Sequence, residues 1–287
     1  MVNPQRILDD CGLLSASVVP VHGGDINQAY CVSGGGAKYF LKVNDAKLYP
    51  GMFEKEARGL AALHDKTGLV VPGILKVGNL DQQQYLVMEW MEPGKPATNF
   101  WENFGSLLAG LHRQKQEYFG WEEDNYIGSL PQVNTVADSW PLFFADCRIM
   151  PLVRRLFDEN SFSKRDITTA EILCKKLDQL FPGEPPALLH GDLWSGNYMV
   201  AANGHAAVYD PAVYFGHREM DIGMTSLFGG FDQRFYTAYD EAFPLETGWR
   251  ERLQLTQLYP LLVHALLFGG HYISNAKEVM TRYAWAP

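Results

Sequence analysis

The pattern of hydrophobic residues changes once along this chain, and that change limits the folds it can adopt. In the N-terminal third, the runs "SASVVPV", "AYCVSG", "KYFLKV" and "QYLVMEW" are separated by glycines, which is typical of strands and tight turns. After "EWMEPGKPAT" the hydrophobic residues recur at helical spacing. The sequence therefore predicts an α+β fold of two lobes. A small β-rich lobe with one main helix covers residues 1–91, and a larger helical lobe covers residues 92–287, after a Gly/Pro hinge near residues 92–96.

Helices are expected in both lobes. In the first lobe, "MFEKEARGLAALHDKTG" repeats its hydrophobic residues at helical spacing and ends at Gly68. In the second, "NFWENFGSLLAGLHRQ" has one hydrophobic face, and Asn99 with Glu102 can form a reciprocal cap at its start. Pro260 is expected to kink the last of the further helices, which are predicted near residues 139–157, 166–181, 219–242 and 250–270.

Charge and cysteine content exclude several classes of protein. The 287 residues include 33 acidic and 24 basic ones, a net charge of −9, with no basic stripe for a nucleic acid. The four cysteines show no metal-binding spacing. The longest hydrophobic segment, "LYPLLVHALLFGG", is too short to span a bilayer, and the N-terminal residues contain no signal-peptide core. We expect a cytoplasmic protein with neither a membrane nor a nucleic acid among its partners.

Polar residues follow two short hydrophobic runs late in the chain, in "LLHGDLWSGNYMV" and in "VYDPA". They place Asp192, Asn197 and Asp210 on predicted loops. Asn197 and Asp210 suit Mg²⁺, which prefers oxygen ligands and shares its coordination with substrate phosphates. Asp192 is then available to orient and deprotonate an alcohol. Each residue alone is also typical of an ordinary turn, so it is their joint spacing that predicts a site.

The β-rich lobe offers the positive charge that a phosphate group requires. Lys42, at the end of "KYFLKV", is either a surface lysine or a point charge for phosphate oxygens. A carboxylate on the following helix would position its amine. Glu56 is preferred because it lies nearer the hydrophobic stripe of that helix, with Glu54 as the competitor, and the sequence does not settle which of the two meets Lys42.

Two backbone segments of the same lobe are candidates for contacts with a nucleotide. The turn in "VHGGDINQAY" can bring amides close to a phosphate, and a plain hairpin turn is the alternative. At the strand end "MEWMEPG", the carbonyl of Glu89 and the amide of Met91 would serve an adenine edge. The candidate residues of the turn are Gly23, Gly24, Asp25, Ile26 and Asn27.

These residues and spacings resemble those of the protein-kinase-like phosphotransferases, with "HGD" where protein kinases have "HRD" and "DPA" where they have "DFG". Within that group the chain resembles the fructosamine kinase (ketosamine-3-kinase) family, over nearly its whole length. "HGDxxxxN" is shared with aminoglycoside and choline kinases. The narrower runs are "HGDLWSGN", "DPAVYFGHREMDIGM", and "FGWEEDNYIGSLPQVNT" followed by "SWPLFF".

The resemblance implies a role for each candidate residue, with ATP and Mg²⁺ as cofactors. Asp192 corresponds to the catalytic base, and Asn197 and Asp210 correspond to the magnesium ligands. Lys42 corresponds to the lysine that binds the α- and β-phosphates, and Glu56 to its helix partner. The turn at "GGDIN" corresponds to a phosphate loop with fewer glycines than that of a protein kinase.

The resemblance also implies the acceptor. The family phosphorylates the third carbon of a ketoamine, which is a deglycation step, so a small ketoamine or glycated amine is the expected partner. A polyol favours aromatic surfaces with polar edges. The candidate substrate residues are Trp194 beside the base, and Trp121, Asn125 and Tyr126 from the narrower run.

Other residues of these runs have expected structural roles. Glu219 and Asp221 correspond to a structural pair that follows the metal site, although carboxylates at a helix start are also favoured by its dipole. His190 is expected to order the catalytic loop and not to transfer a proton. His112 and His264 lie in helical patterns and are expected to be core or surface histidines.

Three alternative functions are weaker. A kinase for aminoglycosides, choline or another small alcohol would share the fold, but the narrower runs argue against it. A metal-dependent hydrolase that uses His190, Asp192 and Asp210 would leave Lys42 and Glu56 unexplained. An inactive nucleotide-binding module would not require the complete set of catalytic residues. Neither a Walker A motif nor a GxSxG motif is present, and no sequence pattern sets an oligomeric state.

Overall fold

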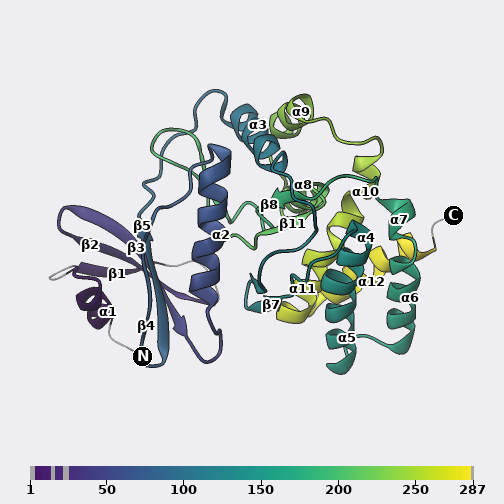
Figure 1. Ribbon diagram of the computed structural model, residues 1–287, viewed down its shortest axis with the longest axis horizontal. Coiled ribbons are helices and arrows are strands. Elements are labelled where there is room, and N and C mark those ends of the chain that lie inside the picture. The colour runs from purple at the N-terminus through teal and green to yellow at the C-terminus, as the bar shows by residue number, and fades with distance from the viewer. Residues whose placement is uncertain (1–3, 14–16, 22–25, 286–287) are drawn as a thin grey trace. The chain divides into compact units, whose positions relative to one another are not determined.

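The structure is a computed structural model that describes residues 4–13, 17–21 and 26–285. The chain forms two compact units. The first unit consists of the residues up to Phe100 together with Tyr198–Asp210, and the second consists of Trp101–Asn197 and the residues from Pro211 onward. The α+β content predicted from the sequence is confirmed, with a sheet in the first unit and mainly helices in the second (Figure 1).

A five-stranded antiparallel sheet forms the centre of the first unit (Figure 1). Its strands lie in the order β1-β2-β3-β5-β4, and four of them coincide with the hydrophobic runs in the sequence. The fifth, β4, is unexpected because "ILKVGNL" lacks a regular alternation, and it pairs with β5 around an irregularity. The strands are Ser17–Val21 (β1), Gln28–Gly34 (β2), Ala37–Asp45 (β3), Ile74–Leu80 (β4) and Gln83–Glu89 (β5).

The two faces of this sheet carry different helices. Side chains alternate between the faces along a strand. One face of β3 and β5 packs with helix α1 (Pro4–Asp10), which the sequence pattern did not reveal because only two of its seven residues are buried. Lys42 lies on the other face, where helix α2 (Met52–Thr67) contacts β5 and β4. Helix α2 ends at Gly68, as predicted. The cluster on the α1 face contains Ile7, Leu8, Val32, Leu41, Val43, Tyr85 and Val87.

A segment from late in the chain belongs to the first unit. Strands β9 (Tyr198–Val200) and β10 (Ala206–Val208) form an antiparallel pair. Ala207 forms a parallel bridge with Val70, and Ala201 forms an antiparallel bridge with Pro93. These contacts attach the stretch that ends at Asp210 to the unit that contains Lys42.

The second unit is mainly helical, with two short antiparallel strand pairs, β6–β7 and β8–β11. One hydrophobic cluster joins most of its helices, with residues from 119 to 284, and α3 and α9 contribute none of its buried residues. The strands are Asn125–Ile127 (β6), Leu130–Gln132 (β7), Ala187–Leu189 (β8) and Tyr214–Gly216 (β11). The helices are Phe100–His112 (α3), Trp140–Phe143 (α4), the π-helix Phe144–Ile149, Met150–Asp158 (α5), Lys164–Cys174 (α6), Leu177–Leu180 (α7), Glu219–Leu227 (α8), Gln233–Ala242 (α9), Trp249–Thr256 (α10), Leu258–Phe268 (α11) and His271–Ala284 (α12).

Several predicted helices are interrupted. The helix expected over residues 219–242 is two helices, α8 and α9, because Gly229 and Gly230 between them have φ values of +90° and +72°. The helix expected over residues 250–270 is also two, and the break falls at Gln257 and not at a kink. Pro260 lies in the first turn of α11, where a missing N–H breaks no helical hydrogen bond.

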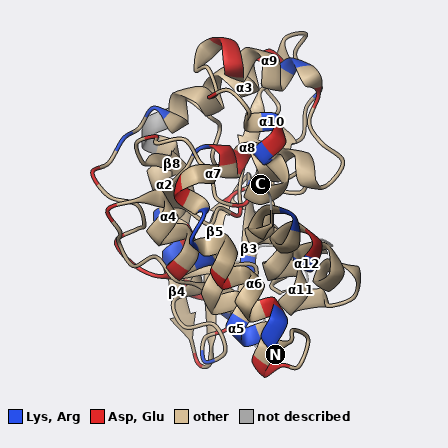
Figure 2. Cartoon of the chain, turned by 90° about the vertical axis from the view of Figure 1, so that its right-hand side faces the viewer, with Lys and Arg blue, Asp and Glu red and all other residues tan. Residues whose placement is uncertain are grey.

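Charged positions are mixed in sign along the chain. In the view of Figure 2, Lys and Arg positions are interspersed with Asp and Glu positions along the described helices and loops. This distribution agrees with the absence of a basic stripe in the sequence. Within the described part of the chain, no helix combines the length and the hydrophobicity needed to cross a bilayer.

Candidate active site

Lys42, Glu56 and Asp210 meet in the first unit around one ammonium group. The Lys42 Nζ donates to Glu56 Oε1 at 2.7 Å, and it also donates to Asp210 Oδ1. The side chains of Lys42 and Glu56 are 7% and 10% exposed, whereas that of Asp210 is 44% exposed. An ammonium held by one buried and one accessible carboxylate is suited to meet a phosphate group.

Periodicity explains why Glu56 and not Glu54 meets the lysine. Glu56 lies four residues before the buried Leu60 and three after the buried Phe53, so it shares the helix face that is turned toward the sheet. Glu54 lies on another face, where its Oε1 accepts from Asn79 Nδ2 at 3.3 Å. The side-chain pairing therefore follows from the helical repeat of α2.

Burial and charge act in opposite directions on this cluster. Burial alone lowers the pKa of the Lys42 amine, but the carboxylates of Asp210 and Glu56 outweigh it and raise that pKa above its ordinary value. Burial raises the pKa of the Glu56 carboxyl, against the attraction of Lys42 and with a contribution from Asp210. Two carboxylates thus share one ammonium, which stays charged near neutral pH.

The backbone of Asp210 is strained. Its φ is +54°, in the left-handed region that few residues other than glycine adopt. Strained residues of this kind persist where their surroundings hold them, and they often mark functional sites. Two residues a little further along the chain, Ala212 and Val213, are held by hydrogen bonds in the second unit.

The expected phosphate loop lies partly outside the described residues. Gly23, Gly24 and Asp25 belong to the undescribed part of the chain. Asn27 is described, and its Oδ1 accepts from Asn44 Nδ2 at 2.9 Å. Asn44 lies on β3 two residues after Lys42, so the end of the turn that includes Ile26 and Asn27 is bonded to the strand that bears the lysine.

Asp192 and Asn197 meet in the second unit, on the loop that follows β8. The Asn197 Nδ2 donates to Asp192 Oδ2 and to the Asp192 carbonyl, both at 2.9 Å. This arrangement fixes the orientation of the amide, so the Oδ1 of the buried Asn197 is its remaining polar atom. That oxygen accepts no hydrogen bond from a described residue. The pair therefore offers one carboxylate and one amide oxygen on a short loop.

Asp221 holds this loop in place. Its two carboxylate oxygens accept from the backbone amides of His190 and Gly191, at 2.8 and 2.9 Å. His112 Nε2 lies 3.1 Å from the same carboxylate, and His112 Nδ1 lies 2.7 Å from the hydroxyl of Tyr239. Burial alone raises the pKa of Asp221, but the hydrogen bonds and charge of His112, with contributions from His190 and the Gly191 amide, lower that pKa below its ordinary value.

His112, which the sequence pattern placed as a core or surface histidine, is a core residue that contacts Asp221. It is 1% exposed, at the end of the hydrophobic face of α3. A buried histidine needs hydrogen-bond partners, so its place on a hydrophobic helix face predicts that it has some. The sequence pattern does not say that one of them is Asp221. His190 has the structural position expected of it, because its Nδ1 accepts from the Asp192 amide at 3.3 Å.

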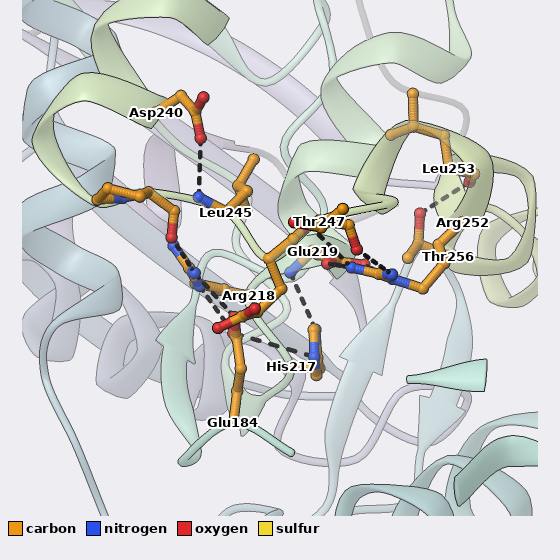
Figure 3. A network of polar contacts seen from close by, with 12 residues as sticks. Glu184, His217, Arg218, Glu219, Asp240, Leu245, Thr247, Arg252, Leu253 and Thr256 are labelled. Carbon is orange, nitrogen blue, oxygen red and sulfur yellow. Dashed lines mark hydrogen bonds and ion pairs between the residues drawn. The ribbon is translucent and has the colours of Figure 1, made fainter. Parts of the chain in front are cut away.

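Two buried arginine–carboxylate pairs fix the start of α8, which carries Asp221 (Figure 3). Arg252 binds both oxygens of Glu219, at 2.5 and 2.9 Å. Arg218 binds both oxygens of Glu184, at 2.7 and 2.8 Å. Both guanidinium groups also donate to carbonyls of the segment between α9 and α10. Bidentate pairs restrict orientation as well as distance, so the helix that presents Asp221 is held from two sides.

The strand end proposed for the nucleotide base has an available amide. The amide of Met91 donates to no acceptor among the described residues, whereas that of Glu89 donates to the Gly73 carbonyl at 2.8 Å. An open cavity of about 520 Å³ lies against the same strand end, between Lys38, Tyr39, Gly73, Trp90 and others. Its lining does not include Lys42, Glu56 or Asp210, so we do not assign the nucleotide to it.

Trp194 lies on the catalytic loop and is only partly buried. Its ring meets Phe228 edge to face, with centroids 5.6 Å apart. Phe228 in turn lies 4.9 Å from the His264 ring. A partly exposed aromatic surface thus lies two residues from Asp192, which is the position expected of a platform for a polyol.

The other candidate substrate residues are more enclosed. Trp121 is partly buried and stacks on Phe215, with centroids 5.6 Å apart. Tyr126 is partly buried, and burial raises the pKa of its hydroxyl. Asn125 is 6% exposed, and its Nδ2 donates to the Val213 carbonyl at 2.9 Å. The structure therefore uses the Asn125 amide inside the fold.

The two units each offer oxygen atoms of the type that Mg²⁺ prefers. They are the carboxylate of Asp210 in the first unit, and the Asp192 carboxylate and Asn197 amide oxygen in the second. Among the described residues, no group of three His, Cys, Asp or Glu side chains could hold a metal without other ligands.

Comparison with known proteins identifies the family. A family model described as fructosamine kinase matches residues 13–285. The chain belongs to the fructosamine kinase family. This member of the family is 38% identical over 281 residues to a protein of Enterococcus faecium named probable ketoamine kinase. The alignment covers 97% of this chain and 99% of that protein.

Solved structures agree with the family assignment. A crystal structure from Thermobifida fusca, of a protein named putative fructosamine-3-kinase, is 38% identical to this fructosamine kinase family member, with a TM-score of 0.86. The match covers 97% of this chain and 96% of that one. The aminoglycoside phosphotransferase APH(4)-Ia shares only the fold, at 14% identity and a TM-score of 0.64, over 98% and 99% of the two chains. The predicted family and the protein-kinase-like fold are confirmed.

Proposed function

We propose that this protein is an ATP- and Mg²⁺-dependent kinase that phosphorylates a hydroxyl group, on the third carbon, of a ketoamine. The observation that supports phosphoryl transfer most directly is the Lys42–Glu56 pair, whose ammonium also holds Asp210. A hydrolase that used only His190, Asp192 and Asp210 would have no need of this pair. The ketoamine as acceptor is supported by the names of the relatives, which are ketoamine and fructosamine kinases.

The residues divide the reaction into two tasks. Lys42 binds phosphate oxygens and is oriented by Glu56, while Asp192 accepts the proton of the acceptor hydroxyl. The hydroxyl oxygen forms a bond to the γ-phosphorus, and ADP leaves with the electron pair of the bond that breaks. Asp210 and Asn197 would hold Mg²⁺, which when bound neutralises charge on the phosphates. The Glu89 carbonyl and the Met91 amide would bind adenine, and the turn at residues 23–27 would cover the phosphates.

The acceptor is proposed to lie against Trp194, with Trp121 and Tyr126 as further contacts. A ketoamine has a polyol end that stacks on aromatic faces and an amine end that can be cationic. Asn125 belongs to the buried network described in the next subsection and is not retained as a substrate contact.

A conservative variant of the base tests this function. Asp192→Asn keeps the size of the side chain and removes the proton acceptor, so kcat should fall by about 10²–10⁴-fold while ATP affinity, measured by calorimetry, is retained. Asp158→Asn at an exposed position of α5 is the matched control and should leave kcat unchanged. Activity is measured on fructosyl-amines, ribulosyl-amines and aminoglycosides with ATP.

Two outcomes would contradict the proposal. Full activity of Asp192→Asn would exclude the carboxylate as the base. Turnover of aminoglycosides alone by the wild-type protein would assign it to the other branch of this fold.

A further inference from the structure

Five buried polar side chains form one connected network beneath the catalytic loop in the second unit. They come from three separate parts of the chain: the narrower family run, the π-helix and helix α11. Their exposed fractions are 6% or less, so every hydrogen bond among them is removed from water. The five residues are Asn125, Gln132, Asn134, Arg148 and Tyr259.

The three amides have unambiguous orientations. Gln132 Nε2 donates to Asn125 Oδ1 at 2.7 Å, and Asn134 Nδ2 donates to the same oxygen at 2.9 Å. The Tyr259 hydroxyl donates to Gln132 Oε1 at 2.8 Å. Reversing any one amide would place donor against donor or acceptor against acceptor, so the network has one arrangement.

Arg148 supplies the strongest donor of the network. Its guanidinium donates to Asn134 Oδ1 at 2.7 Å and to the carbonyls of Val133 and Cys147. It is fully buried, lies within 4.1–5.1 Å of three aromatic rings, and has no carboxylate partner among the described residues. A buried cation without a carboxylate is costly to desolvate, and here the Asn134 amide oxygen, the two carbonyls and the aromatic faces offset that cost.

The network ends on the backbone that follows Asp210. Asn125 Nδ2 donates to the Val213 carbonyl at 2.9 Å, and Gln132 Nε2 donates to the Ala212 carbonyl at 3.1 Å. The Ala212 amide donates to the His190 carbonyl at 2.9 Å. A line of hydrogen bonds therefore connects Tyr259 to the backbone of the loop that carries Asp192, which lies two residues after His190.

We infer that these five side chains are positioning residues for the catalytic loop. By holding the carbonyls of Ala212 and Val213, they keep the Ala212 amide on the His190 carbonyl, and with it the direction in which Asp192 points. Asp221 holds the same loop through the amides of His190 and Gly191. The loop is thus fixed through its carbonyl on one side and its amides on the other. The inference rests on the proposed kinase function for its catalytic consequence, but not for the geometry.

A pair of tyrosine variants tests the inference. Tyr259→Phe removes only the hydroxyl that binds Gln132. Tyr283 lies on helix α12, outside the network, and Tyr283→Phe removes a hydroxyl that donates to the Glu251 carbonyl at 2.5 Å. Both tyrosines are buried, at 3% and 8% exposed. Both variants should lose similar stability, but Tyr259→Phe alone should lower kcat, by about ten-fold, with the KM for ATP unchanged.

Hydrogen exchange gives a readout that does not depend on activity. The amide of Ala212, followed in a peptide that spans it, should exchange faster in Tyr259→Phe and at the wild-type rate in Tyr283→Phe. Equal exchange and equal kcat in the two variants would overturn the inference, and so would faster exchange without any loss of kcat. If the wild-type protein phosphorylates no ketoamine, the proposed function fails, and the exchange at Ala212 still decides whether the network holds this segment.

Discussion

At the residue scale, the sequence predicted pairs better than it predicted networks. The Lys42–Glu56 pair follows from two simple periodicities. The alternation of the strand sets the face of Lys42, the helical repeat sets the face of Glu56, and both patterns can be seen in the sequence. Asn125 was expected at the substrate because it lies in a narrow family run, yet its amide is bonded inside the fold. Its partner Gln132 lies 7 residues away, and Tyr259, which donates to Gln132, lies a further 127 residues along the chain, so no local pattern connects these positions.

The charge of Glu56 can be tested directly. Glu56→Gln keeps the shape but removes the charge that orients Lys42, leaving the ammonium to Asp210 alone. We expect kcat/KM for ATP to fall at least about ten-fold, since each 1.4 kcal/mol of lost transition-state stabilisation is a factor of ten. Glu54→Gln, on another face of the same helix, should stay within about two-fold of the wild type. Equal losses in the two variants would argue against an oriented lysine.

At the element scale, regular segments were predicted and their interruptions were not. Strands β1, β2, β3 and β5 and helix α2 have strong periodic patterns, and they are where the sequence places them. Helices α8 and α9 were expected as one because the hydrophobic pattern continues past the two glycines. Those glycines end the helix because the chain turns there with positive φ values. A hydrophobic pattern carries no information about φ, so it does not predict the break.

Two glycines with positive φ should respond differently to alanine. Gly191, on the catalytic loop, has a φ of +82°, and an added Cβ would collide with the Ala212 carbonyl oxygen. Gly230 has a φ of +72° but no atom within 4 Å of an added Cβ. Gly230→Ala should cost about 1 kcal/mol of unfolding free energy from backbone strain alone, and Gly191→Ala about 3 kcal/mol or more. Urea denaturation measures both, and equal costs would show that the loop moves away from the Ala212 carbonyl at no expense.

At the scale of the whole molecule, the sequence indicated two parts but not how the chain divides between them. A change of pattern near residue 90 suggests one crossing, whereas residues 198–210 return to the first unit. The segment folds on itself as the β9–β10 pair, and the bridges of Ala207 to Val70 and of Ala201 to Pro93 attach it to the rest of the first unit. Strands of three residues are too short to carry a period, so their partners depend on the tertiary fold. The contact of Asp210 with Lys42 therefore depends on tertiary pairing that the order of residues along the chain does not predict.

Stability of the whole chain should depend on pH through His217. This histidine is fully buried, packs against the rings of Trp140 and Phe181, and faces Glu184, Glu219 and Arg252. Burial lowers its pKa below the ordinary value of 6.5, against the attraction of the two carboxylates. The folded state then resists a proton that the unfolded state accepts. The stability that the folded state gains from keeping His217 neutral is therefore fully present above pH 6.5. It is lost as the pH falls through the pKa that His217 has in the folded state.

His217→Phe should reduce this loss, because phenylalanine fits among the same rings and cannot titrate. Between pH 7.5 and 5.5, the unfolding free energy of the wild type should fall more steeply than that of the variant, by at most about 1.4 kcal/mol per pH unit for one proton. Tryptophan fluorescence during urea denaturation is a suitable probe, since six of the seven tryptophans lie in the second unit with His217. His205→Phe, at an exposed position, should keep the wild-type slope. Parallel slopes for His217→Phe and the wild type would mean that the folded protein accepts the proton at His217 as readily as the unfolded chain does, and the carboxylates of Glu184 and Glu219 would then fully offset the cost of burial.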